Sequence, residues 1–389
     1  MATRFTLGIE EEFQIVDHKT NALLSGAPQL LQQEVSGLEE RIKPELLQST
    51  IELITPVLPD MATARHVLRE SRALLAARMA REGQTLVSAG THPFSHWVSQ
   101  APSVGERYTE MVAEYREAAL CNLAFGLHIH VYVDDDRDLL IQVFNRARTW
   151  LPHLLALSTN APFVEGRETG YKSYRPIIKH LLPRSAIPPT FANWQAFDAY
   201  LQELISLGVI DNGKKIWWEV RPHVFYHTLE FRVCDMPLTI QDTLALAALC
   251  QALVAKLTRD IEQGREQELC SVMALEENLW QAMRYGLDAR FLDFSRRRSI
   301  PMRNAIRDLL TDLHEVSEEL GCQPEVAYVY QMLDDPLGTG ADRQLAIYHE
   351  TGDLQEVVRF LRAQTMKDID PVMEGMAGNS ARYGGELSL

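Results

Sequence analysis

Three consecutive glutamates stand in a segment that otherwise alternates between apolar and polar residues. In "FTLGIEEEFQIVD" (residues 5–17), the alternation places Glu10 and Glu12 on one face of a predicted β-strand and the apolar residues on the other. Glu11 interrupts the apolar face, which leaves open a bulge or a strand edge at that position. Carboxylates that project together from one strand face are suited to binding a cation.

Two further segments have the same pattern, with an apolar face for packing and a polar face opposite it. The paired polar residues are His128 and His130 in "LAFGLHIHVYV" (123–133), and Glu230 and Arg232 in "TLEFRVCD" (228–235). If the three strands are neighbours, cations have to offset the repulsion between their carboxylates. Oxygen-rich ligation with one imidazole suits Mg²⁺ or Mn²⁺, and such ions commonly hold the phosphates of a nucleotide.

Each segment alone also has an ordinary structural explanation. A run of glutamates is usually a solvated charge run, and two histidines on one strand face are as often hydrogen-bonded core residues as metal ligands. A Glu-x-Arg pair is most often a cross-strand salt bridge. The occurrence of all three on strands of one pattern favours a cavity that binds metal and nucleotide.

Periodicity and turn residues predict the elements that position these strands. The expected elements are a helix over 61–83, a strand within 85–94 followed by a loop, a helix over about 105–122, and strands over 215–223 and 228–235 joined as a hairpin. From about residue 240, long amphipathic and apolar segments predict a helical half. These apolar helices leave room for a homodimer interface.

The chain has no internal repeat and no low-complexity linker. This favours a single composite domain over residues 1–373, with a sheet-rich part that holds the metal site at 1–240 and a helical part at 241–373. The Gly-rich, polar segment 374–389 is expected to be mobile or to fold over another part of the protein.

Composition and charge exclude several classes of function. The 389 residues are 46% hydrophobic, which suits a globular fold, and the net charge of -15 with no basic run beyond "SRRRS" (295–299) argues against nucleic acid. Five scattered cysteines without a CxxC pair suggest a reducing, cytoplasmic location. No apolar stretch reaches the roughly 18 residues of a membrane span, and "LALAALCQALVAKL" (244–257) is typical of a buried helix.

An ordered set of motifs resembles the type 2 glutamate–cysteine ligase family, the carboxylate–amine ligases. The motifs are "GIEEEF", "ELLQSTIELITPV", "AGTHPF", "GLHIHV", "LSTNAPFVEGRETGYKSYR", "WWEVRP", "TLEFRVCD" and "RYGLDAR", which together reach to about residue 294. The resemblance implies an α+β fold like that of glutamine synthetase, with a curved, mainly antiparallel sheet that lines the active site and helices packed outside it. It also implies that ATP, bound with Mg²⁺, phosphorylates a substrate carboxylate, and that an amine then attacks the acyl phosphate to form an amide.

The resemblance assigns roles position by position. The expected metal ligands are Glu10, Glu12, Glu45, Glu52, His128 and Glu230. Arg232 is expected to contact the transferred phosphoryl group, and together with Glu12 and Glu230 it forms the expected catalytic set.

Substrate contacts are expected from guanidinium and aromatic groups in two further motifs. These residues are Tyr171, Tyr174 and Arg175 of "GYKSYR", Trp218 and Arg221 of "WWEVRP" beside Trp217, together with His130 and Asn160. Packing and surface salt bridges remain the alternative for the two motifs, and satisfaction of loop backbone groups is the alternative for Asn160 and for His92. Family members commonly have Asp where Glu219 stands.

The expected substrates are the γ-carboxylate of glutamate and the amine of cysteine, and a ligase for another amino acid and amine stays open. A second hypothesis is a small-molecule phosphotransferase of related fold. A non-catalytic nucleotide-binding module is a third, which is disfavoured because all six expected metal ligands are present.

Overall fold

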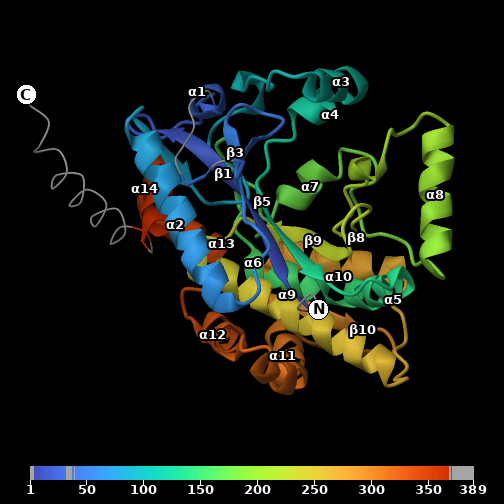
Figure 1. Cartoon of the computed structure of the whole chain (residues 1–389). Helices are drawn as coiled ribbons and strands as arrows, with labels where there is room; N and C mark the ends of the chain where they lie inside the picture. Colours follow the sequence, from blue (N-terminus) through green and yellow to red (C-terminus); the bar gives the residue numbers. More distant parts are fainter. Residues whose placement is uncertain (1–3, 32–36, 39, 368, 370–389) are drawn as a thin grey trace, which may run out of the picture.

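The computed structural model describes residues 4–31, 37–38, 40–367 and 369. A seven-stranded sheet forms its centre, with the strand order β2-β3-β1-β5-β9-β8 and with β4 also paired to β1 (Figure 1). Its strands are β1 Leu7–Asp17, β2 Ile42–Pro44, β3 Thr50–Ile54, β4 Gln84–Val87, β5 Gly126–Tyr132, β8 Val220–Pro222 and β9 Thr228–Asp235. All of these strand pairs are antiparallel, so the antiparallel sheet predicted from the sequence is confirmed.

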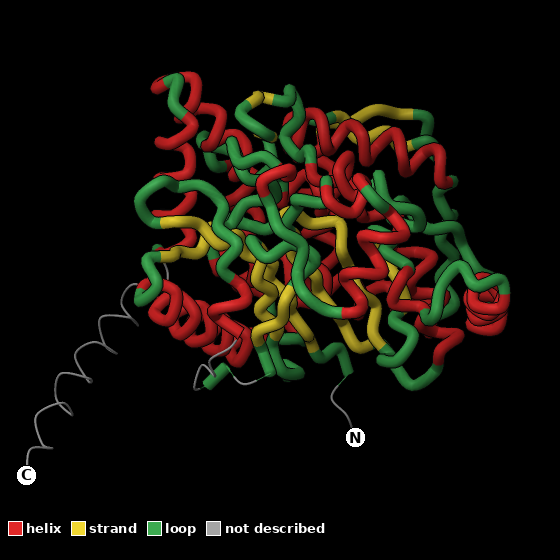
Figure 2. The backbone as a smooth tube through the Cα atoms, turned by 90° about the horizontal axis from the view of Figure 1, so that it is seen from above, coloured by secondary structure: helices red, strands yellow, loops and turns green. Residues whose placement is uncertain are grey.

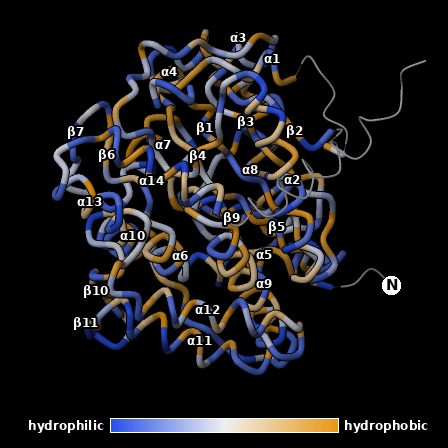
Figure 3. Tube along the Cα trace, turned by 90° about the vertical axis from the view of Figure 1, so that its left-hand side faces the viewer, coloured by the Kyte–Doolittle hydropathy of each residue, from blue (hydrophilic) through white to orange (hydrophobic). Residues whose placement is uncertain are grey.

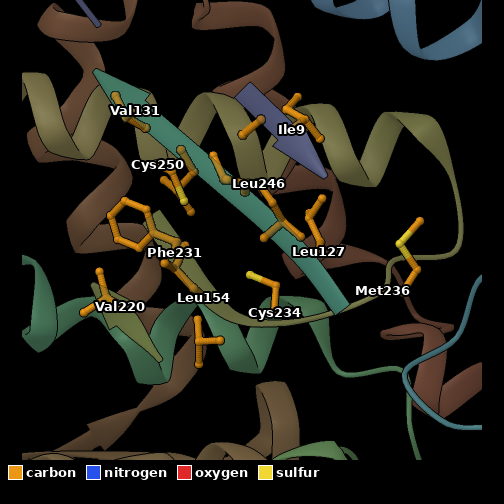
Figure 4. Close-up of a cluster of buried hydrophobic side chains, with 14 of the residues drawn as sticks. Ile9, Leu127, Val131, Leu154, Val220, Phe231, Cys234, Met236, Leu246 and Cys250 are labelled. Atoms are coloured by element: carbon orange, nitrogen blue, oxygen red, sulfur yellow. The ribbon is translucent and has the colours of Figure 1, made fainter. Parts of the chain in front are cut away.

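Helices cover the apolar face of the sheet. In Figure 4, Ile9, Leu127 and Phe231 from three neighbouring strands lie near Leu246 and Cys250 of the long helix α9, and all five side chains are buried. Seen from above in Figure 2, the strands run through the middle of the molecule with helices around them. The apolar residues that alternate along each strand therefore form a core, and their polar neighbours face the opposite side of the sheet.

The helices vary in length from single turns to the 23 residues of α9. They are α1 Ala27–Leu31, α2 Met61–Ala80, α3 Glu106–Tyr115, α4 Glu117–Leu120, α5 Arg137–Ala147, α6 Leu151–Ser158, α7 Arg175–Lys179, α8 Trp194–Ser206, α9 Ile240–Glu262, α10 Val272–Tyr285, α11 Met302–Glu319, α12 Gln323–Asp334, α13 Gly340–Thr351 and α14 Leu354–Met366. Short 3₁₀ turns are η1 Trp97–Ser99, η2 Arg148–Trp150, η3 Gly213–Lys215 and η4 Gly286–Asp288. Helices α11 and α12 pack on α9, which gives the molecule a second helical layer (Figure 1).

Helix α9 is the buried helix that the sequence predicts within 244–257. Thr239 caps its N-terminus, and the Asp242 side chain completes a capping box. By length and composition α9 could cross a membrane, yet 83% of its most apolar window is buried inside the protein. The helix therefore has the surroundings of a core helix.

Two small hairpins lie outside the main sheet. They are β6 Phe163–Val164 with β7 Arg167–Glu168, and β10 Arg290–Asp293 with β11 Arg298–Pro301. The second hairpin contains most of the "SRRRS" segment and is largely hydrophilic (Figure 3). It interrupts the part of the chain that the sequence predicts as helical. The prediction missed this hairpin because its residues have no clear apolar alternation.

Element boundaries differ from the sequence prediction in two places. The helix predicted over about 105–122 is divided at Arg116, whose φ of 52° lies outside the right-handed helical region and separates α3 from α4. The strand predicted over 215–223 is limited to Val220–Pro222, although its hairpin with β9 is confirmed.

Glu11 lies on the buried face of a regular strand, so both the bulge and the strand edge that the sequence left open are wrong. β1 pairs in unbroken register with β3 from Glu10 to Gln14 and with β5 from Leu7 to Glu11. Its carboxylate accepts two hydrogen bonds from Arg72 of α2, one of them from Nε at 2.9 Å, and one from Thr243 of α9 at 3.0 Å. The carboxylate and the guanidinium are both fully buried, so each neutralises a charge that would otherwise be costly in the core.

Replacing Arg72 with Met is expected to lower the free energy of unfolding by about 3–5 kcal/mol, because it leaves the Glu11 carboxylate buried without its partner. The double variant Glu11→Leu/Arg72→Met should regain most of this loss, since apolar groups then replace both charges. Urea denaturation of the three proteins measures the difference. Equal stability of Arg72→Met and the unmodified protein would contradict the argument.

One cluster of buried apolar side chains runs from Leu7 in β1 to Ile369 after α14 and includes side chains of α9, α10, α11 and α12. The sheet and the helical part thus share a core. This supports the single composite domain over residues 1–373, which stays a prediction. The expectation for the segment 374–389 lies outside the described residues.

Candidate metal and substrate site

The polar faces of the three predicted strands meet in the sheet. β1 lies between β3 and β5, and β5 also pairs with β9. The register places Glu12 opposite Glu52, Glu10 opposite His128, His130 opposite Glu230, and Glu230 opposite Arg221. Because alternate residues of a strand share a face, this pairing gathers the charged side chains of five strands on one side of the sheet.

A cavity of about 490 Å³ lies over this polar face. The ionisable side chains that line it include Glu10, Glu12, Glu45, Glu52, Arg107, His128, Arg175, Lys179, Lys214, Arg221 and Arg232. The sheet supplies six of these, whereas α3, α7, η3 and the segment after β2 supply the rest. Carboxylates and cationic side chains therefore share one enclosed space.

Two groups of side chains could each hold a cation. Glu10, His128 and Glu230 can bring one ligand atom each within 4.8 Å of one another, and so can Glu12, Glu52 and His128. His128 Nδ1 lies 3.0 Å from Glu10, and its Nε2 lies 3.7 Å from Glu12. This Nε2 atom is buried and has no hydrogen-bond partner among the described residues. A buried nitrogen without a partner beside carboxylates fits a metal ligand.

The electrostatics of the carboxylates also fit a bound cation. Burial, followed by the nearby Glu12 carboxylate, raises the pKa of Glu45 to about 7. Burial and then Glu45 and Glu10 raise the pKa of Glu52 well above its ordinary value. Burial and then Arg232 lower the pKa of His128, which favours the neutral imidazole that binds metals. A divalent cation between these groups would stabilise their negative charge, and this oxygen-rich set suits Mg²⁺ or Mn²⁺.

Glu230 is fully buried between two guanidinium groups. Arg221 donates to its carboxylate from Nε at 2.6 Å and from Nη2 at 3.2 Å, and Arg232 donates from Nη1. Burial alone would raise the pKa of Glu230, but Arg221 and Arg232 outweigh it and hold the pKa well below its usual value. Arg232 lines the cavity, and its buried Nε has no partner in the described part of the chain. This guanidinium is therefore fixed in place with a donor still free for an anion.

His130 lies behind the cavity lining. Its Nε2 is 3.2 Å from Glu10, and its Nδ1 is 3.2 Å from the Thr228 hydroxyl. Burial would lower the pKa of His130, but Glu230 and Glu10 outweigh it and raise the pKa. His130 therefore contacts Glu10 and does not itself line the cavity, and the substrate contact predicted for it stays a prediction.

Arg175 fits the predicted role in binding a carboxylate. Its side chain is buried at the start of α7 and lines the cavity, and Nη1 donates to the backbone carbonyl of Arg232 at 3.1 Å. No described carboxylate forms a salt bridge with it, and its Nε has no partner among the described residues. The guanidinium of Arg175 lies against β5 at Gly126, and it fits there because glycine has no side chain. A Cβ atom at this position would lie 2.0 Å from Nη2 of Arg175.

The Gly126→Ala substitution is therefore expected to push Arg175 away from its position and to raise the KM of the carboxylate substrate about tenfold or more. Steady-state kinetics with a thermal melt measure this effect. Gly83→Ala is not a suitable control because its φ is 69°, whereas Gly8 has ordinary contacts around its Cβ position, so Gly8→Ala is the matched variant. An unchanged KM in Gly126→Ala would contradict the role of Arg175.

Besides His130, four of the predicted substrate residues do not line this cavity. Trp218 is buried in an aromatic cluster, stacked on Tyr200 with ring centroids 5.8 Å apart, and its neighbour Trp217 lines the cavity. Both tryptophans lie in the irregular segment before β8, and of the two only Trp217 lines the cavity. Asn160 is also buried away from the cavity, where it donates to the backbone carbonyls of Ser88 and Met236.

The two predicted tyrosines pack against each other, with ring centroids 6.0 Å apart, and do not line the main cavity. Tyr174 borders a separate hollow of about 170 Å³ together with His92. The ring of His92 accepts hydrogen bonds from the backbone N–H groups of Phe94 and Ser95, which is the structural alternative considered for it. Tyr171 is partly buried against the core.

Sequence reasoning missed several lining residues. Arg107, Tyr108 and Met111 reach the cavity from α3, and Lys179 reaches it from α7. For Lys179 a signal existed, because a residue four positions after Arg175 lies on the same helical face. Nothing in the periodicity of the sequence relates α3 to the sheet.

The chain is similar to known ligases over most of its length. A model of glutamate–cysteine ligase family 2 matches residues 6–359. A protein from Solibacter usitatus is 43% identical over 362 residues, which cover 92% of this chain and 93% of the relative. A protein from Sorangium cellulosum is 44% identical over 364 residues, covering 93% and 96%. Both bear the name "Putative glutamate–cysteine ligase 2".

Two solved structures share the fold at low sequence identity. The crystal structure of glutamate–cysteine ligase from Francisella tularensis in complex with AMP is 13% identical, with a TM-score of 0.71, and covers 99% of this chain and 96% of that chain. The bifunctional glutathione synthetase from Pasteurella multocida is 15% identical, with a TM-score of 0.67, and covers 94% of this chain and 53% of that chain. The α+β architecture expected from the sequence, with a sheet that lines the site, is confirmed.

The fold and these matches together define an ATP-dependent ligase. The chain belongs to glutamate–cysteine ligase family 2, because the family model spans most of it and relatives above 40% identity cover more than nine-tenths of it. The resemblance read from the motifs is confirmed.

Proposed function

We propose that this protein joins the γ-carboxylate of glutamate to the amine of cysteine with the hydrolysis of ATP. The observation that carries the proposal is the meeting of carboxylates, an imidazole and a guanidinium on one face of the sheet, in a family whose relatives are named glutamate–cysteine ligases. Such a face suits phosphoryl transfer, which depends mainly on positioning and on stabilising negative charge.

Two cation positions follow from the grouping of the ligands. Glu10, His128 and Glu230 would hold one Mg²⁺ or Mn²⁺ ion, and Glu12 and Glu52 would hold another with Glu45 nearby. Bound there, the ions would neutralise phosphate oxygens and polarise the transferred phosphoryl group. The presence of AMP in the solved ligase of the same fold supports a nucleotide at this cavity.

The protein's own side chains would act on both reactants. Arg232 is fixed by Glu230 and has a free Nε, so it can donate to the phosphoryl group as negative charge accumulates. Arg175 can bind a substrate carboxylate, and the burial of both guanidinium groups strengthens these interactions.

Another amino acid or amine remains the main alternative for the substrates. A change of one methylene or hydroxyl in a substrate pocket alters binding by only about 1–3 kcal/mol, so the shared fold does not decide the substrate. A small-molecule phosphotransferase is a further alternative. It would release a stable phosphorylated product, whereas a ligase releases phosphate only together with an amide.

The decisive experiment measures phosphate release from ATP and Mg²⁺ with glutamate present, across a panel of amines that includes cysteine and a control without amine. Release that depends on one amine, with the matching amide in the mass spectrum, would support the proposal and identify the substrate. Phosphate release without amide, or a stable phosphorylated product, would overturn it.

Further proposals concern the setting of the enzyme. We infer a cytoplasmic protein that acts on small amino-acid substrates, with a single composite domain over residues 1–373 and with apolar helices that leave room for a homodimer. The five cysteines are free, which suits a reducing compartment. Size-exclusion chromatography with light scattering would test the dimer.

A further inference from the structure

Lys179 is a buried amine that borders the cavity. It is the last residue of α7, one helical turn after Arg175, and both side chains line the cavity. Its Nζ donates to a carboxylate oxygen of Glu219 at 3.0 Å and lies 3.4 Å from the backbone carbonyl of Arg232. An ammonium group has three N–H donors, so the third position of Nζ is left for a substrate.

Glu219 holds Lys179 in this orientation. The Glu219 carboxylate is fully buried, and its second oxygen accepts a hydrogen bond from Nε2 of His180 at 2.9 Å. The backbone carbonyl of Glu219 also accepts a hydrogen bond from the Arg232 N–H at 2.8 Å. A buried carboxylate that orients a proton-accepting side chain toward the reactants is the arrangement found in hydrolase triads.

The surroundings of Nζ favour proton transfer near neutral pH. Burial, opposed by Glu219 and reinforced by the neighbouring cations Arg175 and Arg232, lowers the pKa of Lys179 to about 8. His180 shares the Glu219 carboxylate. At pH 7 roughly one molecule in ten would carry the neutral amine, which is the form that accepts a proton.

Other groups at the cavity are less suited to this task. The carboxylates and His128 are the candidate cation ligands, and guanidinium groups do not lose a proton. The Tyr108 hydroxyl donates to the Pro44 carbonyl, and Nδ1 of His223 accepts from two backbone N–H groups. Lys214 also lines the cavity, but its side chain is exposed rather than buried.

We propose that Lys179 is the general base of amide formation, which takes a proton from the ammonium group of the acceptor amine. This role rests on the proposed ligase function. Neutral Nζ accepts the proton, and the freed lone pair of the amine forms the C–N bond with the acyl-phosphate carbon. The C–O bond to phosphate breaks, phosphate leaves with that electron pair, and it takes up the second proton that the amine nitrogen loses, which leaves a neutral amide and hydrogen phosphate. Glu219 stabilises the resulting Lys179 ammonium, which then passes its proton to solvent.

The test compares two nucleophiles in the Lys179→Met variant. Cysteine presents an ammonium group and needs a base, whereas hydroxylamine is uncharged at neutral pH and forms a hydroxamate without one. The expected result is a fall of about a hundredfold or more in kcat with cysteine, while the hydroxamate rate stays within about threefold of the unmodified protein. Equal falls with both nucleophiles, in protein that melts normally, would overturn the role of Lys179.

Three controls sharpen this test. Lys179→Arg keeps the positive charge but cannot accept a proton at neutral pH, so it should resemble Lys179→Met; full activity with cysteine would overturn the proposal. Glu219→Gln removes the anion beside Nζ, which should lower the pKa of Lys179. The acidic limb of the profile of kcat against pH should then move to lower pH, and a limb that does not move would count against the proposal. Lys19→Met, at an exposed position, should change nothing.

Failure of the ligase function itself would be distinguishable. If the unmodified protein forms neither amide with any amine in the panel nor hydroxamate, the proposed function is overturned and the role of Lys179 with it. If the unmodified protein forms both products, the comparison of nucleophiles decides the role of Lys179 alone.

Discussion

Replacing Glu12 with Gln is expected to abolish amide formation and to leave the protein folded. The carboxylate lies 3.7 Å from Nε2 of His128 and opposite Glu52, so the substitution removes a charge from one of the two candidate cation positions. A bound metal contributes several kcal/mol to transition-state stabilisation, which corresponds to a rate loss of about a thousandfold or more.

The fold should survive this change for a specific reason. Glu12 accepts a hydrogen bond from the Gly126 N–H at 2.5 Å, and the amide oxygen of Gln can accept the same bond. Phosphate release, Mn²⁺ titration and a thermal melt measure the three consequences separately. The exposed Glu276→Gln on α10 is the matched control. Activity near that of the unmodified protein would remove Glu12 from the catalytic set.

Replacing Glu230 with Gln is expected to abolish turnover as well, but with a loss of stability that Glu12→Gln lacks. Glu230 is fully buried and neutralises Arg221 and Arg232, so the variant leaves two guanidinium groups in the interior without their anion. Breaking a buried ion pair costs about 3–5 kcal/mol of unfolding free energy. The sequence does not reveal this burial, so the loss of stability could not be predicted from it.

A double variant separates stability from catalysis at Glu230. Glu230→Gln/Arg221→Met removes one of the two unpaired cations, so it should be more stable than Glu230→Gln while remaining inactive. Denaturant unfolding and phosphate release provide the two readouts. A stable single variant would show that the pair contributes little to the fold, and an active double variant would contradict the catalytic role of Glu230.

The pH dependence of stability should follow the same ion pairs. Arg221 and Arg232 hold the pKa of Glu230 below its value in the unfolded chain. A carboxyl with a depressed pKa stabilises the folded state above its unfolded pKa, and this contribution is lost as the pH falls through the folded pKa. Acid unfolding should therefore begin at higher pH in Glu230→Gln than in the unmodified protein.

Strand alternation made the central part of the site predictable. Glu10 and Glu12 share a face of β1, His128 and His130 share a face of β5, and Glu230 and Arg232 share a face of β9, because alternate residues of a strand point to the same side. This is a local property of the backbone, and it holds without knowledge of the fold.

Contacts between side chains that are distant in the sequence could not be predicted from strand alternation. Glu11 meets Arg72 from α2, and Lys179 meets Glu219 from the segment before β8. Each contact depends on how two elements dock, and periodicity within either element does not determine that. Asn160 illustrates the same limit, because only the tertiary structure shows that it joins two buried backbone segments.

The sequence by itself determined the faces of the strands, the buried helix α9 and, through its ordered motifs, the family. These features follow from local alternation, capping and residue identity. Only the tertiary structure decided the shape of the cavity, the burial of Glu230 between two guanidinium groups and the approach of Arg175 to Gly126. The reason is physical: burial and pairing energies arise between elements, and they exist only once the chain has brought those elements together.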